Sequence, residues 1–379
     1  MMQYLFVSSG SLTLFIIILI LGRRNRSLSN TILIVWLMVF LLNIVTLFIL
    51  YEATPPFSIA QSLLLEFSEV SIFAHGPLFW LYTRSLTEED FTLDWKHRYH
   101  FIPFVIAYAL FLAHIFSRTE MAQPLRNTIT ILKMASFAPY VILVLVQLKG
   151  HRIRVARIFS NIEEKTLQWI SFLGWGILVI WAVAGGSLLL DRLTTIHIPQ
   201  YGGLIAHITI CIFVFFMGYF GLNQPSVFGT HQTASLGLDP NTNHGKASNG
   251  NEFPKYKNSG LDPEGSKRIQ KDLLQLMKTA TPYLEKELTL YTLAEQLGVQ
   301  SNHLSQVINS LEGKNFFDFI NTYRVESAKE KIRDGNCQKL TLLGIAFDSG
   351  FNSKASFNRA FKKVTGQTPT EYRRSLVSI

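Results

Sequence analysis

Seven apolar stretches, each close to the length of a membrane-crossing helix, fill the first 222 residues of this chain. A transmembrane helix needs about 20 predominantly apolar residues, because the hydrocarbon core of a bilayer is about 30 Å thick. Backbone polar groups find no water inside that core, so separate apolar stretches must cross it as helices. We therefore expect residues 1–222 to form a seven-helix transmembrane region. The expected spans are 4–21, 31–51, 59–82, 100–116, 128–148, 168–190 and 201–221.

The basic residues between these spans predict the orientation of the region. Short cytoplasmic loops are enriched in Lys and Arg. The first apolar stretch is preceded by no basic residue and is followed by Arg23, Arg24 and Arg26, which is typical of a retained helix rather than a signal peptide. Basic residues gather again after the third and fifth spans and are scarce in the other loops. We expect a multi-pass protein of the inner (plasma) membrane, with its N-terminus outside and its C-terminal part in the cytoplasm.

Charge inside the expected spans is costly and usually functional or paired, and four of the ionisable residues there lie at matching depths. Glu66 and Glu69 share one face of the third span, while Lys133 and His207 lie at a similar depth in the fifth and seventh. They form a structural ion pair, line a water-filled gap between helices, or form an outward-opening pocket for a small polar signal molecule. The run His75–Pro77 predicts a kink in the third span.

The composition changes after residue 222. Residues 223–265 begin with a stretch rich in Gly, Ser, Thr, Asn and Pro, which predicts a flexible cytoplasmic linker. Residues 255–379 then hold 19 Lys and Arg against 13 Asp and Glu. Such a basic domain suits an anionic partner, either DNA or the lipid of the membrane surface. The two cysteines, Cys211 and Cys337, stand far apart, so we expect no metal site, and we see no motif for a cofactor or for catalysis.

Residues 288–309 have the pattern of two short helices joined by a tight turn. Ala294 is small enough for the helices to cross, Gly298 supplies the turn, and Leu304 anchors the second helix. These offsets are those of a helix-turn-helix unit. An ordinary helical hairpin is the alternative for this segment taken alone.

The same arrangement recurs in residues 340–363, with Ala346, Gly350 and Phe357 in the corresponding places. We expect residues 315–332, between the two units, to form an amphipathic helix. This helix would hold the two helix-turn-helix units at a fixed separation. The sequence therefore predicts an all-α protein, in which a seven-transmembrane bundle is followed, over residues 266–379, by a bi-lobed helical domain with two helix-turn-helix units.

Residues 266–375 resemble the DNA-binding domain of the AraC/XylS family of bacterial transcription regulators. The resemblance is strongest over the last part, IAFDSGFNSKASFNRAFKKVTGQTPTEYR, where Gly366, Thr368, Pro369, Tyr372 and Arg373 fall at the closing turn and last helix of the family signature. It implies that two recognition helices enter successive major grooves of double-stranded DNA.

The resemblance also implies which side chains contact DNA. Asn and Gln pair well with adenine, and Arg and Lys with guanine, whereas contacts to phosphate add affinity without sequence information. The expected base-facing residues are Gln300, Ser301, Asn302, Ser305 and Gln306 in the first helix and Ser353, Lys354, Ala355, Asn358 and Arg359 in the second; the expected phosphate contacts are Lys362, Lys363, Arg373 and Arg374.

The whole chain is thus expected to be a membrane-embedded transcription regulator that is not an enzyme. It would couple a membrane or extracellular signal to gene expression, with DNA, membrane lipid, a small-molecule signal and a second copy of itself as candidate partners. The alternative is a transporter or channel with a basic regulatory tail, which would be supported by the ionisable residues inside the spans.

Overall fold

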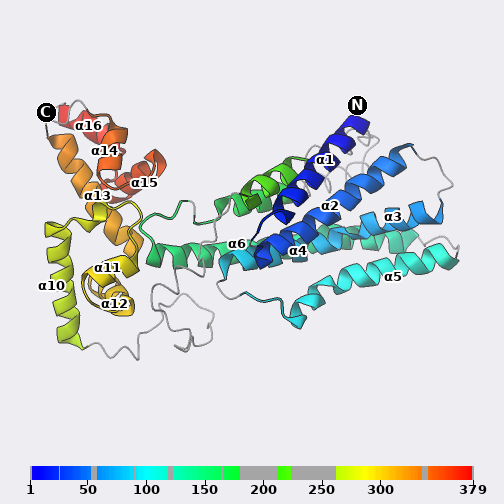
Figure 1. Cartoon of the computed structure of the whole chain (residues 1–379), viewed down its shortest axis with the longest axis horizontal. Helices are drawn as coiled ribbons and strands as arrows, with labels where there is room; N and C mark the ends of the chain where they lie inside the picture. Colours follow the sequence, from blue (N-terminus) through cyan, green and yellow to red (C-terminus); the bar gives the residue numbers. More distant parts are fainter. Residues whose placement is uncertain are drawn as a thin grey trace. The chain divides into compact units, whose positions relative to one another are not determined.

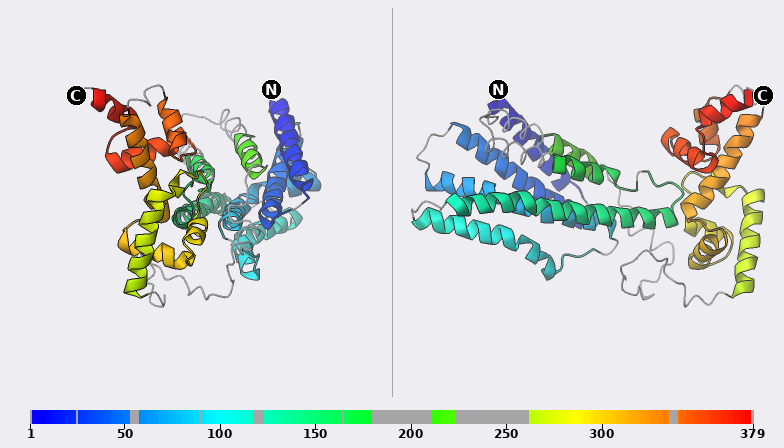
Figure 2. Two further views of the ribbon diagram at one scale, coloured as in Figure 1. Left: turned by 60° about the vertical axis from the view of Figure 1, so that its left-hand side comes forward. Right: turned by 180° about the vertical axis from the view of Figure 1, so that it is seen from behind.

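The apolar part and the charged part of the chain form two compact units in the computed structural model. The first comprises Met1–Lys149 and Leu167–Gly229, and the second comprises Gly150–Thr166 and Thr230–Ile379. The structure describes residues 2–24, 26–52, 58–88, 91–117, 123–163, 165–179, 211–222, 262–334 and 340–377. Within these ranges the secondary structure is helical, as predicted, apart from an isolated antiparallel bridge between Phe159 and Thr289. Figures 1 and 2 show the helices of each unit.

Apolar helices build the first unit. Its core contains Trp36, whose ring packs 5.6 Å from that of Phe79 and whose Nε1 donates a hydrogen bond of 2.9 Å to Nδ1 of His75. α6 continues past Lys149, so its last residues belong to the second unit. The helices are α1 (Met2–Leu21), α2 (Leu28–Glu52), α3 (Ile59–Val70), α4 (Ile72–Thr87), the 3-10 helix η1 (Trp95–Phe101), α5 (Ile102–Ser117) and α6 (Gln123–Ile158), followed by the helical segments Gln168–Val179 and Cys211–Leu222.

Four helices among the described residues are long and apolar enough to cross a membrane. They correspond to the first, second, fourth and fifth expected spans. The sixth and seventh are described only in part, as two short apolar helices, because residues 180–210 lie outside the described residues. The four long helices are Gln3–Leu21, Leu28–Ile49, Trp95–Ser117 and Ile131–Ile158.

The third expected span is divided into α3 and α4 at Ser71, not at the predicted kink. The Ser71 hydroxyl lies 2.8 Å from the carbonyl oxygen of Ser68 and 3.1 Å from the side-chain oxygen of Asn43 in α2. A serine side chain that bonds the backbone in this way competes with the helix ladder. Pro77 lies within α4, and Gly76 serves packing instead, because a Cβ there would lie 2.5 Å from the ring of Tyr140.

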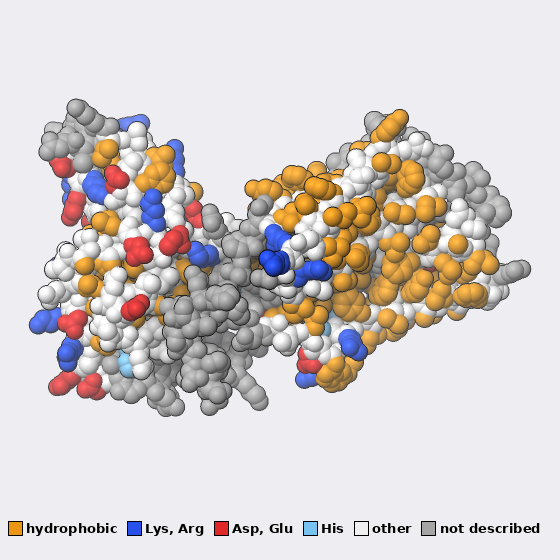
Figure 3. Space-filling model, in the orientation of Figure 1, with side chains coloured by type: hydrophobic (Ala, Val, Ile, Leu, Met, Phe, Trp, Pro, Cys, Tyr) orange, Lys and Arg blue, Asp and Glu red, His pale blue; other side chains and the backbone are white. Residues whose placement is uncertain are grey.

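The helices of the first unit expose large apolar side chains. Phe116 is 70% exposed and Phe172 is 69% exposed. Figure 3 shows hydrophobic side chains over most of the visible face of this unit, whereas charged side chains of both signs are scattered over the second. Contiguous apolar surface of this kind is unfavourable in water and favourable in contact with lipid. The described helices of the first unit therefore carry exposed apolar surface that would be favourable against lipid.

Five helices of the second unit begin at residues whose side chains cap them. Asp262, Thr289, Asn315, Thr341 and Ser353 each accept a hydrogen bond from a backbone N–H in the first turn of the helix that follows. Such caps satisfy donors that the helix itself leaves without partners. The elements are α10 (Pro263–Thr279), the 3-10 helix η2 (Pro282–Leu284), α11 (Leu290–Gln296), α12 (Ser301–Leu311), α13 (Phe316–Arg333), α14 (Leu342–Asp348), α15 (Lys354–Thr365) and α16 (Pro369–Val377).

α13 joins two separate hydrophobic cores. Its first half buries Phe319 and Ile320 in a cluster with α10, α11 and α12, which we call the first lobe. Its second half buries Val325 and Ala328 in a cluster with α14 and α15, which with α16 forms the second lobe. One continuous helix therefore holds the two lobes together.

Candidate nucleic-acid interface

In the first lobe, α11 and α12 form a helix pair with one buried and one exposed face. Gly298 adopts a left-handed φ of 65° in the turn between them, a conformation that favours glycine. Ala294 and Leu304 are buried between the helices, as the sequence predicts. On the opposite face of α12, Gln300 and Asn302 are exposed, and Ser301 and Ser305 are half-buried.

Gln306 differs from its expected role on the exposed face. Its side chain is half-buried, and its Oε1 is buried without a hydrogen-bond partner in the part of the chain that the structure describes. A buried amide oxygen is not available to a base edge. Gln306 can therefore offer DNA at most part of its amide group.

In the second lobe, α14 and α15 repeat this arrangement. Gly350 in their turn has a φ of 88°, and Ala346 and Phe357 are buried between the helices. Ser353 caps α15 by accepting a hydrogen bond of 3.0 Å from the backbone N–H of Ser356. Toward the start of α15, the side chains of Lys354, Ala355, Asn358 and Arg359 are exposed.

The expected phosphate contacts lie at the end of α15 and in α16. Lys362 and Arg374 are exposed, and Arg373 is half-buried. Lys363 is exposed but forms an ion pair of 2.7 Å with Asp318 of α13. The second lobe thus presents a cationic surface around α15, whereas the expected base-facing positions of α12 include no Lys or Arg.

A carboxylate from outside the two lobes lies against α15. Glu163, in the segment Gly150–Thr166 that belongs to the same unit, forms an ion pair of 2.7 Å with Nη2 of Arg359. Its other carboxylate oxygen accepts a hydrogen bond from the hydroxyl of Ser353. Two of the residues expected to contact DNA are therefore bound by one side chain of this chain.

Arg324 of α13 fixes the same segment to the first lobe. Its guanidinium, 1% exposed, donates to the carbonyl oxygen of Tyr283 at 2.7 Å, to that of Glu285 at 2.7 Å, and to that of Ser160 at 3.2 Å. It also donates to the Ser160 hydroxyl at 3.0 Å. Burial lowers the pKa of Arg324 to about 10, which leaves it charged at neutral pH. A buried charge of this kind requires a full set of acceptors, and these carbonyl groups supply it.

Glu287 connects the segment, the first lobe and the second lobe. Its carboxylate accepts hydrogen bonds from Asn161 at 3.0 Å, from Lys165 at 2.9 Å and from Asn352, which precedes α15. Partial burial opposes the ionisation of Glu287, but the bonds from Asn161 and Lys165 and the charge of Lys165 outweigh it. They hold the pKa of Glu287 below its usual value. The sequence pointed to none of Glu163, Arg324 and Glu287, because charged residues in helices and loops are most often solvated.

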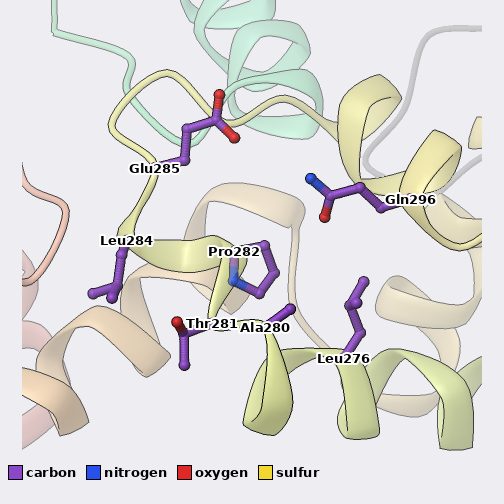
Figure 4. A pocket seen from close by; sticks show the side chains of 7 residues that line it. All are labelled: Leu276, Ala280, Thr281, Pro282, Leu284, Glu285 and Gln296. Atoms are coloured by element: carbon purple, nitrogen blue, oxygen red, sulfur yellow. The ribbon is translucent and has the colours of Figure 1, made fainter.

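The second unit also has an open hollow on the first lobe, between the end of α10 and α11 (Figure 4). It measures about 560 Å³ and is lined partly by Leu276, Pro282 and Leu284. Gln296 points toward the hollow, and Glu285 points away from it. Its lining includes none of the residues expected to face DNA.

In the first unit, the structure brings two of the four expected pocket residues together. Lys133 is 8% exposed, and its Nζ lies 2.6 Å from Oε2 of Glu69. Glu66 is half-buried in α3, and His207 lies outside the described residues. The Glu69–Lys133 contact is the ion pair that the sequence offered as one alternative.

Comparison with known proteins bears on the second unit. Residues 293–375 match the family model of a helix-turn-helix domain. Residues 293–375 therefore form a helix-turn-helix domain. This chain is 40% identical over 91 residues to an uncharacterised HTH-type transcriptional regulator of Staphylococcus aureus (strain COL), a match covering 24% of this chain and 12% of that protein. It is 31% identical over 102 residues to the HTH-type transcriptional regulator GlxA of Rhizobium meliloti (strain 1021), which covers 27% of this chain and 30% of that protein.

Two solved structures also match part of this chain. One is a protein of unknown function from Listeria innocua, 34% identical, with 28% of this chain and 95% of that chain covered and a TM-score of 0.25. The other is the C-terminal domain of AraT, a response regulator from Geobacillus stearothermophilus, 29% identical, with 31% and 88% covered and a TM-score of 0.25. The chain spans only 12% of the length of the Staphylococcus relative, and the matched residues 293–375 include no part of the apolar first unit.

Proposed function

We propose that this chain is a membrane-embedded transcription regulator that binds specific DNA sequences. The observation that carries the proposal is the pair of exposed polar helices, α12 and α15, each at the second position of a helix pair and both held by α13. An exposed helix with Asn, Gln, Ser, Lys and Arg side chains suits the major groove of DNA. In this proposal each helix pair acts as a helix-turn-helix unit.

The side chains divide by the kind of contact they make. Asn302, Asn358 and Arg359 are exposed on the two recognition helices and would read base edges. Lys362 and Arg374 would contact phosphate and set the orientation of the domain. The remaining expected contacts keep the same roles, except that Gln306 contributes through one amide atom.

The first unit would hold the regulator in the plasma membrane with seven spans. Its support is the set of four long apolar helices, the two shorter ones, and their exposed aromatic and aliphatic side chains. The basic residues that follow α1 and those near the end of α6 would lie on the cytoplasmic side. The helix-turn-helix domain would lie on this side too, and the N-terminus would lie on the opposite side.

The signal would act on the first unit. A polar ligand that competes for Lys133 would separate it from Glu69, because a charge buried among apolar helices must keep a partner. The test is the response of a reporter gene in cells that express Glu66→Gln or Lys133→Ala at normal levels. An unchanged response in both variants would remove these residues from signal recognition.

The test of the function is selection from a randomised duplex library by the full chain in lipid nanodiscs, with affinity measured at several salt concentrations. We expect a motif with two boxes about one helical turn apart, because the two recognition helices would enter successive grooves. We also expect the affinity to fall with salt as phosphate contacts release counterions. Weak binding without sequence preference would instead favour the transporter or channel with a basic tail.

A further inference from the structure

The segment Gly150–Thr166, which begins in the last turns of α6, contacts α15 through Glu163. We infer that Gly150–Thr166 is an internal inhibitor of the helix-turn-helix domain, in which Glu163 takes the place of DNA at Ser353 and Arg359. The inference rests on the proposed function, because it requires α15 to read DNA. It adds a mechanism by which the chain itself controls that contact.

Glu163 binds two side chains that DNA would contact in the proposed function. Its carboxylate pairs with the Arg359 guanidinium at 2.7 Å and accepts from the hydroxyl of Ser353, the residue that caps α15. Arginine and the N-terminus of a helix are the two protein groups that most favour a phosphate, and both favour a carboxylate for the same reason. DNA and Glu163 therefore compete for the same groups.

The segment has a firm attachment on one side of Glu163. Ser160 is 1% exposed, and its backbone N–H donates to the carbonyl oxygen of Leu288 at 3.1 Å, beside the bridge between Phe159 and Thr289. Its hydroxyl and carbonyl oxygen both accept from Arg324. These buried bonds attach the segment to the first lobe independently of Glu163.

The attachment to the second lobe is weaker. The side chain of Glu163 is 23% exposed and that of Arg359 is 51% exposed, so water screens their ion pair. A groove of about 400 Å³, lined partly by Arg152, Ile162 and Lys314, lies beside them. A partly solvated contact next to an open groove can break while the buried contacts of Ser160 remain. The contact with α15 is therefore the part that can respond to a signal.

α6 offers a physical link to such a signal. It is one continuous helix from Gln123 to Ile158, and it includes Lys133, the partner of Glu69. Glu163 follows the end of this helix after four residues. A rotation or shift of α6 would move the start of the segment and so withdraw Glu163 from α15. The inhibited state would be the one in the structure, in which Glu163 contacts Arg359.

The test compares Glu163 variants of the full chain in nanodiscs, with the affinity for the selected DNA sequence as readout. Glu163→Gln removes the charge, and Glu163→Asp keeps the charge but shortens its reach. The control is Glu326→Gln, which removes a carboxylate from α13 that pairs with Lys329 at 2.7 Å. We expect Glu163→Gln and Glu163→Asp to bind about fivefold more tightly than the unchanged chain, as is appropriate for a partly screened ion pair, and the control to bind as the unchanged chain does.

Each other outcome overturns the inference in a recognisable way. Equal, sequence-specific binding by all forms would mean that Glu163 does not compete with DNA, while the proposed function stands. Tighter binding by Glu163→Gln with no change in Glu163→Asp would indicate long-range charge repulsion instead of occupation of the site. Absence of specific binding by every form would reject the proposed function together with the inference.

Discussion

The two lobes of the helix-turn-helix domain share an architecture but differ in what surrounds their exposed helices. α12 presents Gln300 and Asn302 and has no basic residue at its expected base-facing positions. α15 presents Lys354, Arg359 and, in its last turn, Lys362, and it is contacted by Glu163. In this chain the cationic helix is the one that carries an internal carboxylate.

This difference between α12 and α15 suggests different contributions to DNA binding, with α15 supplying more of the affinity and α12 more of the sequence discrimination in the proposed function. Cations attract phosphate and base edges strongly but depend on salt, whereas amides and hydroxyls discriminate bases with little gain in affinity. A carboxylate placed on α15 would therefore lower the affinity of the proposed DNA contact, by the roughly fivefold factor expected for Glu163. A similar contact on α12 would change affinity little.

The largest expected difference between the lobes is in stability and concerns their two turn glycines. A Cβ on Gly350 would lie 2.5 Å from the carbonyl oxygen of Tyr283, whereas a Cβ on Gly298 would meet nothing within 4 Å. Both have a left-handed φ, which costs an alanine about 1 kcal/mol. We expect Gly350→Ala to lower the free energy of local unfolding by about 3 kcal/mol, since overpacking adds to the strain, and Gly298→Ala by about 1 kcal/mol. Amide hydrogen exchange in each lobe measures both; equal losses would mean that the close approach at Gly350 relaxes freely.

The next effect concerns Arg359, which contacts Glu163 in the structure and DNA in the proposal. In the Glu163→Gln background, Arg359→Ala should weaken DNA binding by about 1 to 3 kcal/mol and relax specificity in one box. In the unchanged chain the loss of affinity should be smaller. There, Arg359→Ala removes a DNA contact and also removes the ion pair through which Glu163 would compete with DNA. The double-mutant cycle is measured by titration of DNA at fixed salt. Identical losses in the two backgrounds would show that the two contacts of Arg359 are independent.

The sequence predicted the parts of this structure that depend on local periodicity. The burial of Ala294, Leu304, Ala346 and Phe357 follows from repeated apolar spacing, and the connecting helix predicted over 315–332 is found as Phe316–Arg333. Such patterns arise because a helix brings every third or fourth residue to one face. They require no knowledge of distant segments.

The sequence could not predict contacts between distant positions. Glu163 and Arg359 are 196 residues apart, and Arg324 and Ser160 are 164 apart, so neither pair leaves a periodic trace. The break at Ser71 is a similar case, because the bond of its side chain to Asn43 of a neighbouring helix contributes to it. The prediction of a kink rested only on local signals, namely a glycine and a proline. Nothing in the sequence indicated that Gly76 packs against Tyr140.

A smaller effect is expected on the first lobe. Asn302→Ala should weaken binding to the selected sequence by roughly 1 kcal/mol and relax preference at one base pair, because an Asn that reads adenine contributes mainly discrimination. The slope of affinity against salt should not change, since no phosphate contact is lost. Lys362→Ala is the matched comparison and should reduce that slope by about one unit without changing the preferred sequence. A reduced slope in Asn302→Ala would place α12 against the backbone instead of the bases.

The smallest effect is a pH dependence at Glu287, the carboxylate that joins the segment to both lobes. Its pKa is lowered in the docked state despite partial burial, because Asn161 and Lys165 bond to its ionised form. The stabilisation is therefore fully present above the ordinary pKa of a glutamate and is lost as the pH falls through the lowered value. We expect the amide of Ser160, which bonds to Leu288, to lose protection from hydrogen exchange as the pH falls below the ordinary pKa of a glutamate, after correction for the intrinsic rate. In Glu287→Gln, the Ser160 amide should be less protected at neutral pH, and its protection should not change as the pH falls. If the pH-dependent loss persists in this variant, another carboxylate causes it, and Glu163 is the first to examine.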